Sequence, residues 1–336
     1  MNLLAKKQNR FIQIDALRGI AAVVVVLHHY LFIYGRDFNR QQLLPQVFEH
    51  GYFGVELFFI ISGFVIYYSI SKSASIKTFL LKRAIRLYPI YWICLIITFV
   101  AIQIFPLSVS RNTNFKEALL GLTMFNGLFK GVKSVDPSYW SLLIEWFFYI
   151  MIAVVFAINK NKEKIKLFLW GWLVLILFYN LVYKIPVIGA FFNLRYGPLF
   201  IAGICFYYIY ALNEQTFHNW LLLTASYVAA MVSLQDLYLL FPALTVIFLL
   251  VIVALHFNFK FFQNSMLLFL GKISYALYLI HQNLGFIIME LGHKAGIPFF
   301  ISVIGALSIS ILIAFLLTNY IEQPISNKLK KVLSIK

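Results

Sequence analysis

Arg18 and His29 are the first residues whose types and spacing could do chemistry together. Both lie in the apolar run of residues 11–34, FIQIDALRGIAAVVVVLHHYLFIY, which is long enough to cross a membrane. An ionisable side chain at bilayer depth is costly, so it normally faces a cavity or a partner. In a helix, the eleven-residue spacing turns the side-chain direction by a net of only about 20° over roughly 16 Å of axis. The run therefore predicts that Arg18 and His29 share one helix face, with the cation near the start of the span and the potential base toward its other end. The alternative is that Arg18 snorkels to the surface and His29 bonds a neighbouring helix.

Two carboxylates are predicted at the depth of His29. Glu56 lies in GYFGVELFFIISGF and Glu145 in SYWSLLIEWFFY, each a few residues inside its apolar run. A carboxylate beside a histidine orients the ring and raises its basicity, which suits a general base acting on a hydroxyl. We therefore assign His29, Glu56 and Glu145 to a catalytic site, with a buried packing cluster as the alternative. His28 points roughly 100° away from His29 and is the weaker candidate for the base.

A basic group is predicted at the opposite end of the first run. Arg83 and Arg86 are three residues apart in FLLKRAIRLYPIYW, which makes them neighbours on a helix. Guanidinium groups on one face suit phosphate oxygens, and with Arg18 these two predict a vestibule for a polyphosphate ligand. The alternative is that Arg83 and Arg86 only flank a span and contact lipid head groups. Asp15 is expected to pair with Arg18, and Glu322 to neutralise an arginine.

A polar stripe is predicted on one helix near the C-terminus. Ser274, Tyr278 and His281 stand at i, i+4 and i+7 in GKISYALYLIHQ, which places them on one face. Such a stripe lines a channel or makes hydrogen bonds between helices. Farther on, Pro324 in NYIEQPISNKLKK is expected to end the last helix and leave a basic cytoplasmic tail at residues 325–336.

The elements that position these residues are predicted to be membrane-spanning helices. The 336 residues are 62% hydrophobic and 12% charged, which is far from the composition of a soluble protein. Apolar runs recur throughout, so the chain is predicted to be an all-α polytopic membrane bundle forming one domain, residues 1–336. A shorter apolar stretch, residues 115–129, is predicted to be re-entrant or interfacial. Ten spans are expected, at about residues 11–34, 53–71, 87–104, 139–159, 167–183, 195–212, 217–234, 238–257, 266–290 and 298–321.

The distribution of charged residues and the two cysteines limit the classes of partner and ligand that the sequence predicts. The net charge is +16, but the basic residues gather at span ends, so topology explains them better than nucleic acid does. Ten spans put both termini on one side. If that side is the cytoplasm, cytoplasmic segments carry roughly twice the Lys and Arg of the others, which predicts cytoplasmic termini. Cys94 and Cys205 fall inside predicted spans, where packing is the default, so no metal is expected.

These groups together indicate one activity. A donor with phosphates would bind the arginines from the cytoplasm, and chemistry would occur deeper in the membrane at His29. Coenzyme A thioesters fit, because the long pantetheine arm could pass along a pore while His29 acts as base on an acceptor hydroxyl. Loops at residues 36–50 and 105–138 would recognise the acceptor. Direct transfer and an acyl-enzyme on His29 or Ser62 both fit the sequence.

The chain resembles the acyltransferase-3 family of membrane O-acyltransferases over nearly its whole length. Six segments carry the resemblance in order, and together they are specific. They are the Arg-x10-His pattern at Arg18 and His29, GYFGVELFFIISGFVI around Glu56, Ser62 and Gly63, the Arg-x-x-Arg pattern at Arg83 and Arg86, Tyr139-Trp140-Ser141-Leu142 with Glu145, Gly271-Lys-Ile-Ser274-Tyr275 leading to His281, and Glu322-Gln-Pro324.

The resemblance implies transfer of an acyl group, usually acetyl, from acyl-CoA to sugar hydroxyls of envelope polysaccharides or of small glycosylated products. It implies a bacterial cytoplasmic membrane location. It makes the motif histidine, His29, essential and places the motif arginines, Arg18, Arg83 and Arg86, on the donor. Ser274 and Glu322 are assigned to the donor site with them. Some members carry an added extracytoplasmic esterase-like domain; because this sequence ends at Lys336 without one, we expect it to finish the transfer itself or to use a separate extracytoplasmic partner.

Two other functions compete with this interpretation. A transporter or lipid-linked-sugar flippase would also carry polar residues in its spans and a basic vestibule. It would often show paired halves or interrupted helices at matching positions, which this sequence does not show. A non-catalytic scaffold in a polysaccharide-assembly complex is the other alternative, but it leaves the shared predicted depth of His29, Glu56 and Glu145 without a reason.

Overall fold

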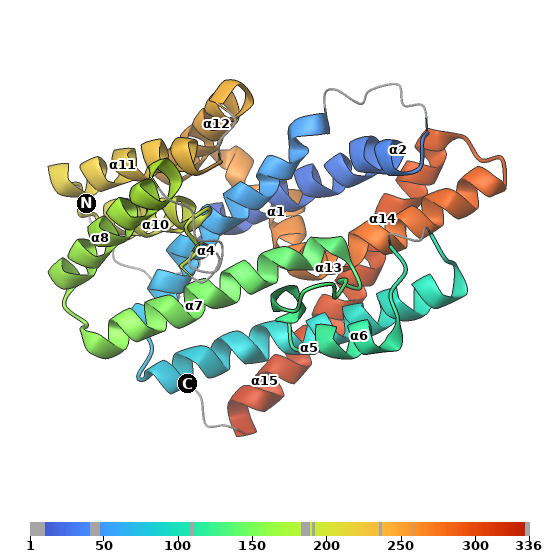
Figure 1. Ribbon diagram of the computed structural model, residues 1–336, viewed down its shortest axis with the longest axis horizontal. Helices are drawn as coiled ribbons and strands as arrows, with labels where there is room; N and C mark the ends of the chain where they lie inside the picture. The colour runs from blue at the N-terminus through green and yellow to red at the C-terminus, as the bar shows by residue number, and fades with distance from the viewer. Residues whose placement is uncertain are drawn as a thin grey trace.

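The computed structural model describes residues 11–40, 48–107, 111–182, 189, 192–234, 237–257 and 259–332. Within these residues the regular structure is helical and no strand occurs, which confirms the predicted all-α class. The longer helices run roughly side by side along the long axis of the molecule (Figure 1). Seven helical stretches of the described chain are long and apolar enough to cross a membrane, and two shorter apolar helices cover Gly197–Ala211 and Phe241–His256.

Each of the ten predicted spans falls on a helix. The first half of the chain forms α1 (Ile12–His28), the π-helical η1 (His29–Ile33), α2 (Tyr34–Asp37), η2 (Glu49–Phe53), α4 (Gly54–Ser71), α5 (Ile76–Ile104), α6 (Phe115–Gly121), η3 (Asn126–Leu128), η4 (Pro137–Tyr139) and α7 (Trp140–Ile158). The second half forms α8 (Lys162–Leu181), α10 (Gly197–Phe206), η5 (Tyr207–Ala211), α11 (Phe217–Leu234), α12 (Leu237–His256), η6 (Lys260–Gln263), α13 (Ser265–Lys294), α14 (Phe299–Leu317), η7 (Thr318–Glu322) and α15 (Gln323–Val332). Residues 41–47 and 108–110 of the predicted acceptor loops, residue 183 of the fifth span and residues 333–336 of the tail lie outside the described residues.

Helix α5 begins eleven residues earlier than the predicted span at 87–104. Its start is fixed by Ser75, whose hydroxyl oxygen accepts a hydrogen bond from the backbone N–H of Thr78 at 3.1 Å and so caps the helix. Arg83 and Arg86 therefore lie inside one long helix rather than ahead of it. Pro89 is accommodated within the same helix.

The prediction that Pro324 ends the last helix is wrong. Helix α14 continues through the π-helical η7 into α15, in which Pro324 is the second residue. The π-helical turn directly before Pro324 changes the local pattern of backbone hydrogen bonds, so the helix continues past a residue that has no N–H to donate. The described part of the basic tail is therefore helical.

The segment predicted as re-entrant or interfacial forms the seven-residue helix α6 and a 3-10 turn. Seven residues are too few to cross a bilayer. Aromatic side chains of α5 hold the segment by donating to consecutive carbonyls: Tyr91 to Gly121 O at 2.7 Å, Trp92 to Leu122 O at 2.8 Å and Tyr88 to Thr123 O at 2.9 Å. It therefore lies along α5, as Figure 1 shows.

Two glycine pairs bring helix backbones into direct contact. On α1 and α13, a β-carbon added at Gly271 would collide with the backbone oxygen of Asp15, and one at Gly19 with that of Leu267. On α4 and α10, Gly63 and Gly203 face each other in the same way. Small residues allow this close approach in membrane bundles. The α1–α13 contact matters most, because α1 carries Arg18 and His29.

Replacing Gly271 with alanine should lower the thermal stability of the purified protein in detergent. The added methyl group meets backbone rather than a flexible side chain, so α13 must move away from α1 at a cost of about 1–3 kcal/mol. Gly305→Ala on α14 is the matched control, since nothing lies within 4 Å of its added β-carbon. We expect the control to melt at or above the wild-type temperature, and equal melting of Gly271→Ala would contradict the close contact.

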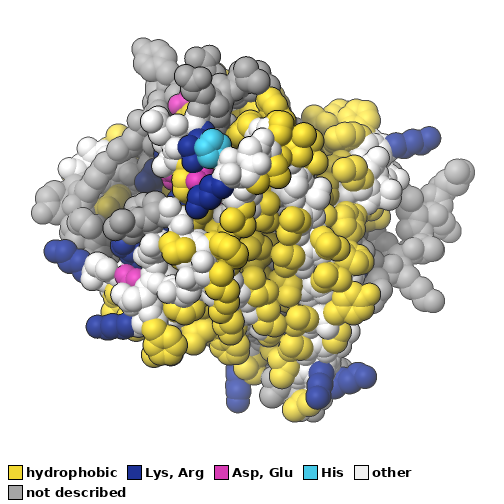
Figure 2. Space-filling view, turned by 90° about the vertical axis from the view of Figure 1, so that its right-hand side faces the viewer, with side chains coloured by type: hydrophobic (Ala, Val, Ile, Leu, Met, Phe, Trp, Pro, Cys, Tyr) yellow, Lys and Arg dark blue, Asp and Glu magenta, His cyan; other side chains and the backbone are white. Residues whose placement is uncertain are grey.

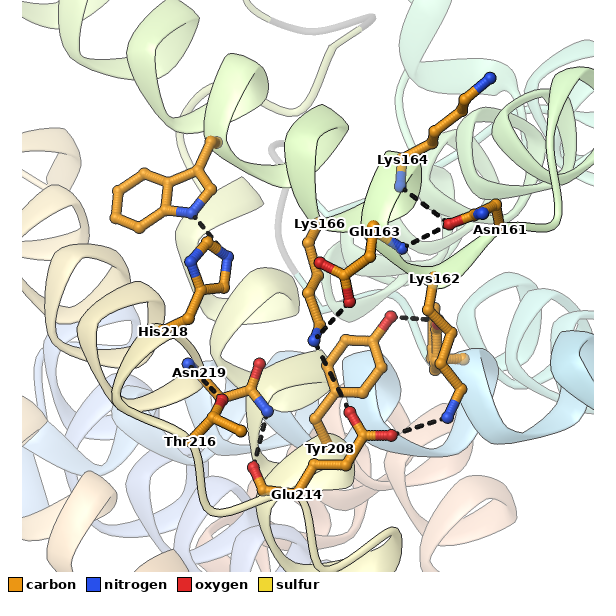
Figure 3. A network of polar contacts seen from close by, with 12 residues as sticks. Asn161, Lys162, Glu163, Lys164, Lys166, Tyr208, Glu214, Thr216, His218 and Asn219 are labelled. Carbon is orange, nitrogen blue, oxygen red and sulfur yellow. Dashed lines mark hydrogen bonds and ion pairs between the residues drawn. The ribbon is translucent and has the colours of Figure 1, made fainter.

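A polar network ties α8 to the start of α11 (Figure 3). Asn161 caps α8, and Lys166, although only 7% exposed, pairs with Glu163 at 3.2 Å and with Glu214 at 3.7 Å. Glu214 also pairs with Lys162 at 2.7 Å. Lys166 lies near a span end like the other basic residues, yet it is buried and paired. The network therefore has a structural role rather than offering a free cation.

The surface is largely apolar. Hydrophobic side chains cover much of the face seen in Figure 2, and the charged side chains lie mostly toward its margins. Large exposed apolar residues include Ile96, Ile104, Ile301, Ile304 and Leu312. Such a surface is unfavourable in water and suits contact with lipid.

Candidate active site

A cavity opens among α1, α4, α5, α7 and α13. It encloses about 670 Å³ of non-atom space, including its open mouth. Its charged lining residues are Arg18 from α1, Arg86 from α5 and Glu145 from α7, and its polar ones include Ser62 and Ser274. A recess lined mainly by apolar side chains with a few converging polar groups is typical of a small-molecule site.

The charges of the cavity compensate one another. Arg18 is repelled by Arg86 and attracted by Asp15, Glu145 and Glu322. Asp15 thus attracts Arg18 with the expected sign, and Glu322 acts on both arginines of the cavity. The attraction of the carboxylates therefore offsets part of the repulsion between the two guanidinium groups.

Arg83 differs from its neighbour Arg86. It is buried, donates to Ser69 Oγ at 3.0 Å and lies over the ring of Phe79, and it is not among the residues that line the cavity. The sequence pattern of two arginines three apart thus places only Arg86 at the cavity wall.

His29 begins the π-helical turn η1 and retains part of its surface exposed. Its Nδ1 lies 2.8 Å from the carbonyl oxygen of Val25 and 3.1 Å from Nε2 of His281 on α13. A carbonyl oxygen can only accept, so Nδ1 carries the proton and Nε2 of the neutral ring is a free base. No described residue bonds Nε2. Arg18 and His29 both face α13, as their spacing predicts.

His28 is turned away from this pair. Its Nδ1 bonds the carbonyl oxygen of Phe48 at 2.8 Å, and its ring packs against Phe32 and Tyr52. It is 5% exposed. This agrees with the predicted divergence of neighbouring residues on a helix.

The structure does not bring Glu56 or Glu145 into hydrogen-bond contact with His29 among the described residues, so the predicted carboxylate–histidine pair is wrong. Glu145 accepts from Ser62 Oγ at 3.0 Å in the arginine cavity. Glu56 is buried and is attracted by Arg195, on the segment that precedes α10.

The reason lies at the start of α7. Glu145 is predicted at the depth of His29 only if its span begins at the membrane surface. In the structure the preceding turn η4 is already inside the protein, where Tyr139 donates to the carbonyl oxygen of Leu279 at 3.1 Å and Tyr278 donates to that of Ser138 at 2.8 Å. Helix α7 therefore starts beside the middle of α13. Glu145, five residues after the start of α7, falls in the cavity that Arg18 and Arg86 line.

The carboxylate associated with the histidines is Asp136, which the sequence analysis missed. It is fully buried, accepts from the backbone N–H and hydroxyl of Ser138 at 2.9 and 2.7 Å, accepts from the backbone N–H of Asn283 at 2.9 Å, and attracts His281 electrostatically. Its sequence signal is Asp-Pro-Ser, a typical helix start with a capping aspartate, which says nothing about a histidine. Arg111, paired with Asp37 and Asn283, lies near the same group and has no local signal at all.

One aromatic pair separates the cavity from the histidines. Val55, Phe58 and Tyr278 line the cavity, and the rings of Phe58 and Tyr278 are in edge contact, with their centroids 5.9 Å apart. The ring of Tyr278 in turn lies 5.8 Å from that of His281. The predicted stripe of Ser274, Tyr278 and His281 therefore runs from the cavity wall to the histidine that contacts His29, with the ring of Tyr278 between the cavity and His281.

The family model described as "Acyltransferase domain" matches residues 11–319, nearly the whole chain. The chain belongs to the acyltransferase-3 family. With its apolar helices, this makes it an integral membrane protein of an acyltransferase family. All the site residues named above except Glu322 fall within the matched residues.

Two curated relatives of this family member match shorter parts of it. "Protein 2 in picA locus" of Rhizobium radiobacter is 37% identical over 91 residues, which cover 26% of this chain and 42% of that protein. The peptidoglycan O-acetyltransferase OatA of Listeria monocytogenes is 23% identical over 156 residues, covering 41% of this chain and 23% of that protein. The matches thus span less than half of either relative. No solved structure matches the chain.

Proposed function

We propose that this family member transfers an acyl group, acetyl in the first instance, from cytoplasmic acyl-CoA to a hydroxyl of an envelope or exported sugar. The observation that carries the proposal is the placement of Arg18 and His29 against one helix, α13. Arg18 lines the cavity, and His29 has its Nε2 free to accept a proton. The relative from Listeria monocytogenes, whose name describes O-acetylation of peptidoglycan, supports the choice of an acetyl group and of an envelope acceptor.

The donor would bind from the Arg18 end of α1. With cytoplasmic termini, as the charge bias indicates, that end faces the cytoplasm of a bacterial cell and the membrane is the cytoplasmic membrane. Arg18 and Arg86 would bind phosphate oxygens of the donor, with Glu145 and Glu322 keeping the guanidinium groups in place. Ser274 lines the path of the pantetheine arm.

The thioester must pass Tyr278 to reach His29. The Tyr278 hydroxyl bonds Ser141 Oγ at 2.8 Å and the Ser138 carbonyl at 2.8 Å, so the donor arm has to displace a side chain held by two hydrogen bonds. A rotation of the Tyr278 ring would be the smallest movement that lets the donor arm pass. Closure behind the donor would keep water from the thioester.

His29 would then act as general base. Its Nε2 takes the proton of the acceptor hydroxyl while the hydroxyl oxygen attacks the thioester carbonyl carbon. When the carbon–sulfur bond breaks, the thiolate of CoA leaves and takes the proton from the imidazolium. The products are an ester of the acceptor and free CoA, and His29 returns to its starting form.

The test is acyl transfer by purified protein reconstituted in liposomes with acetyl-CoA and cell-envelope glycan. We expect release of free CoA that depends on the glycan, together with new O-acetyl groups on the glycan by mass spectrometry. Envelope glycans from cells lacking the gene should lose the same groups. A flippase would release no CoA from any acyl-CoA, and that result would refute the proposal.

A further inference from the structure

The contacts of the His29 and His281 rings fix where their protons are. His281 Nδ1 lies 2.8 Å from the carbonyl oxygen of Tyr278, which can only accept, so His281 carries its proton on Nδ1 and leaves Nε2 as an acceptor. That acceptor faces His29 Nδ1 at 3.1 Å. The proton on His29 Nδ1 is therefore shared between the Val25 carbonyl and His281 Nε2. This arrangement satisfies every contact of both rings.

We infer that His281 is a positioning residue for His29, and this inference rests on the proposed function. By accepting from Nδ1–H, His281 keeps Nε2 as the unprotonated nitrogen and sets the plane of the ring, with the two rings 71° apart and their centroids 4.8 Å apart. When Nε2 takes the proton of the acceptor, the same hydrogen bond strengthens and stabilises the imidazolium. A neutral histidine thus occupies the place where a carboxylate orients the base in hydrolase triads.

The surroundings of His281 hold it rigidly. The residue has no exposed surface, and its own carbonyl oxygen accepts from the hydroxyl of Tyr30 at 2.8 Å. Asp136 attracts positive charge on His281, whereas His28 disfavours positive charge there. Arg111 likewise disfavours positive charge on His29. Asp136 thus favours positive charge at His281, the ring that accepts the hydrogen bond from His29.

The experiment compares three variants in the liposome assay. His281→Leu removes the acceptor, and we expect kcat to fall by about tenfold to a hundredfold, with the KM for acetyl-CoA unchanged because the arginine cavity is intact. His281→Gln can still accept from His29 Nδ1–H through its amide oxygen, so it should recover most of the lost kcat. His218→Leu, an exposed histidine on α11, should stay within about twofold of wild type.

A measurement that needs no activity complements the assay. Nitrogen-15 NMR of histidine-labelled protein in detergent distinguishes rings protonated at Nδ1 from those protonated at Nε2, and His29→Gln identifies the His29 signals. We expect an Nδ1-protonated His29 in wild type and in His281→Gln, and a mixture of tautomers in His281→Leu.

The outcomes separate this inference from the proposed function. If wild type transfers acyl groups and His29→Gln does not, then unchanged kcat in His281→Leu would overturn the positioning role alone. An Nε2-protonated His29 in wild type would overturn it as well, whatever the kinetics. If His281→Gln is as inactive as His281→Leu while both melt like wild type, the acceptor role is wrong. If wild type transfers nothing, the proposed function and this inference both fall.

Discussion

Replacing His29 with glutamine should lower kcat for acyl transfer by about 10²- to 10⁴-fold, the contribution of a general base. Glutamine has a similar reach, and its amide N–H can still donate to the Val25 carbonyl, so the packing of α1 is retained. The amide has no basic nitrogen, however, and cannot take the proton of the acceptor hydroxyl. The measurement is release of free CoA and formation of O-acetyl glycan at saturating donor.

His28→Gln is the matched control for this variant. His28 adjoins His29 in sequence but bonds the Phe48 carbonyl and packs against Tyr52, so we expect kcat to stay within about threefold of wild type. The KM for acetyl-CoA should change little in either variant, because Arg18 and Arg86 are untouched. Wild-type turnover in His29→Gln would eliminate His29 as the base.

Replacing Arg86 with alanine should raise the KM for acetyl-CoA by about tenfold to 150-fold. A charge-assisted hydrogen bond to phosphate contributes roughly 1.5–3 kcal/mol, and its loss weakens donor binding by that amount. Because the proposed contact is to the phosphates rather than to the reacting atoms, kcat at saturating donor should fall much less. The measurement is initial rate against acetyl-CoA concentration.

Arg83→Ala is the matched control, because it shows whether the change in KM comes from the loss of a cavity contact or from the loss of a positive charge alone. Both arginines lie on α5 and both substitutions remove one positive charge, but only Arg86 lines the cavity, whereas Arg83 bonds Ser69. We expect a clearly smaller rise in KM for Arg83→Ala, with a lower melting temperature. Equal effects of the two variants on KM, or a collapse of kcat in Arg86→Ala with KM intact, would refute the phosphate contact.

The sequence determined the features that depend on one helix at a time. Apolar runs of sufficient length predict the spans, because an unpaired backbone is too costly in lipid. The eleven-residue spacing of Arg18 and His29, and the i, i+4, i+7 spacing of Ser274, Tyr278 and His281, follow from helix geometry alone. These residues do face one another across α1 and α13 in the structure.

Only the tertiary structure decided how far each helix is shifted along its neighbours. The backbone contact of Gly271 with Asp15 sets α13 against α1, and the burial of Tyr139 against Leu279 sets the start of α7. Those shifts move Glu145 to the arginine cavity and give His29 a histidine as its partner instead of a carboxylate. No periodicity within a single run records them, since they arise from packing between residues more than a hundred positions apart.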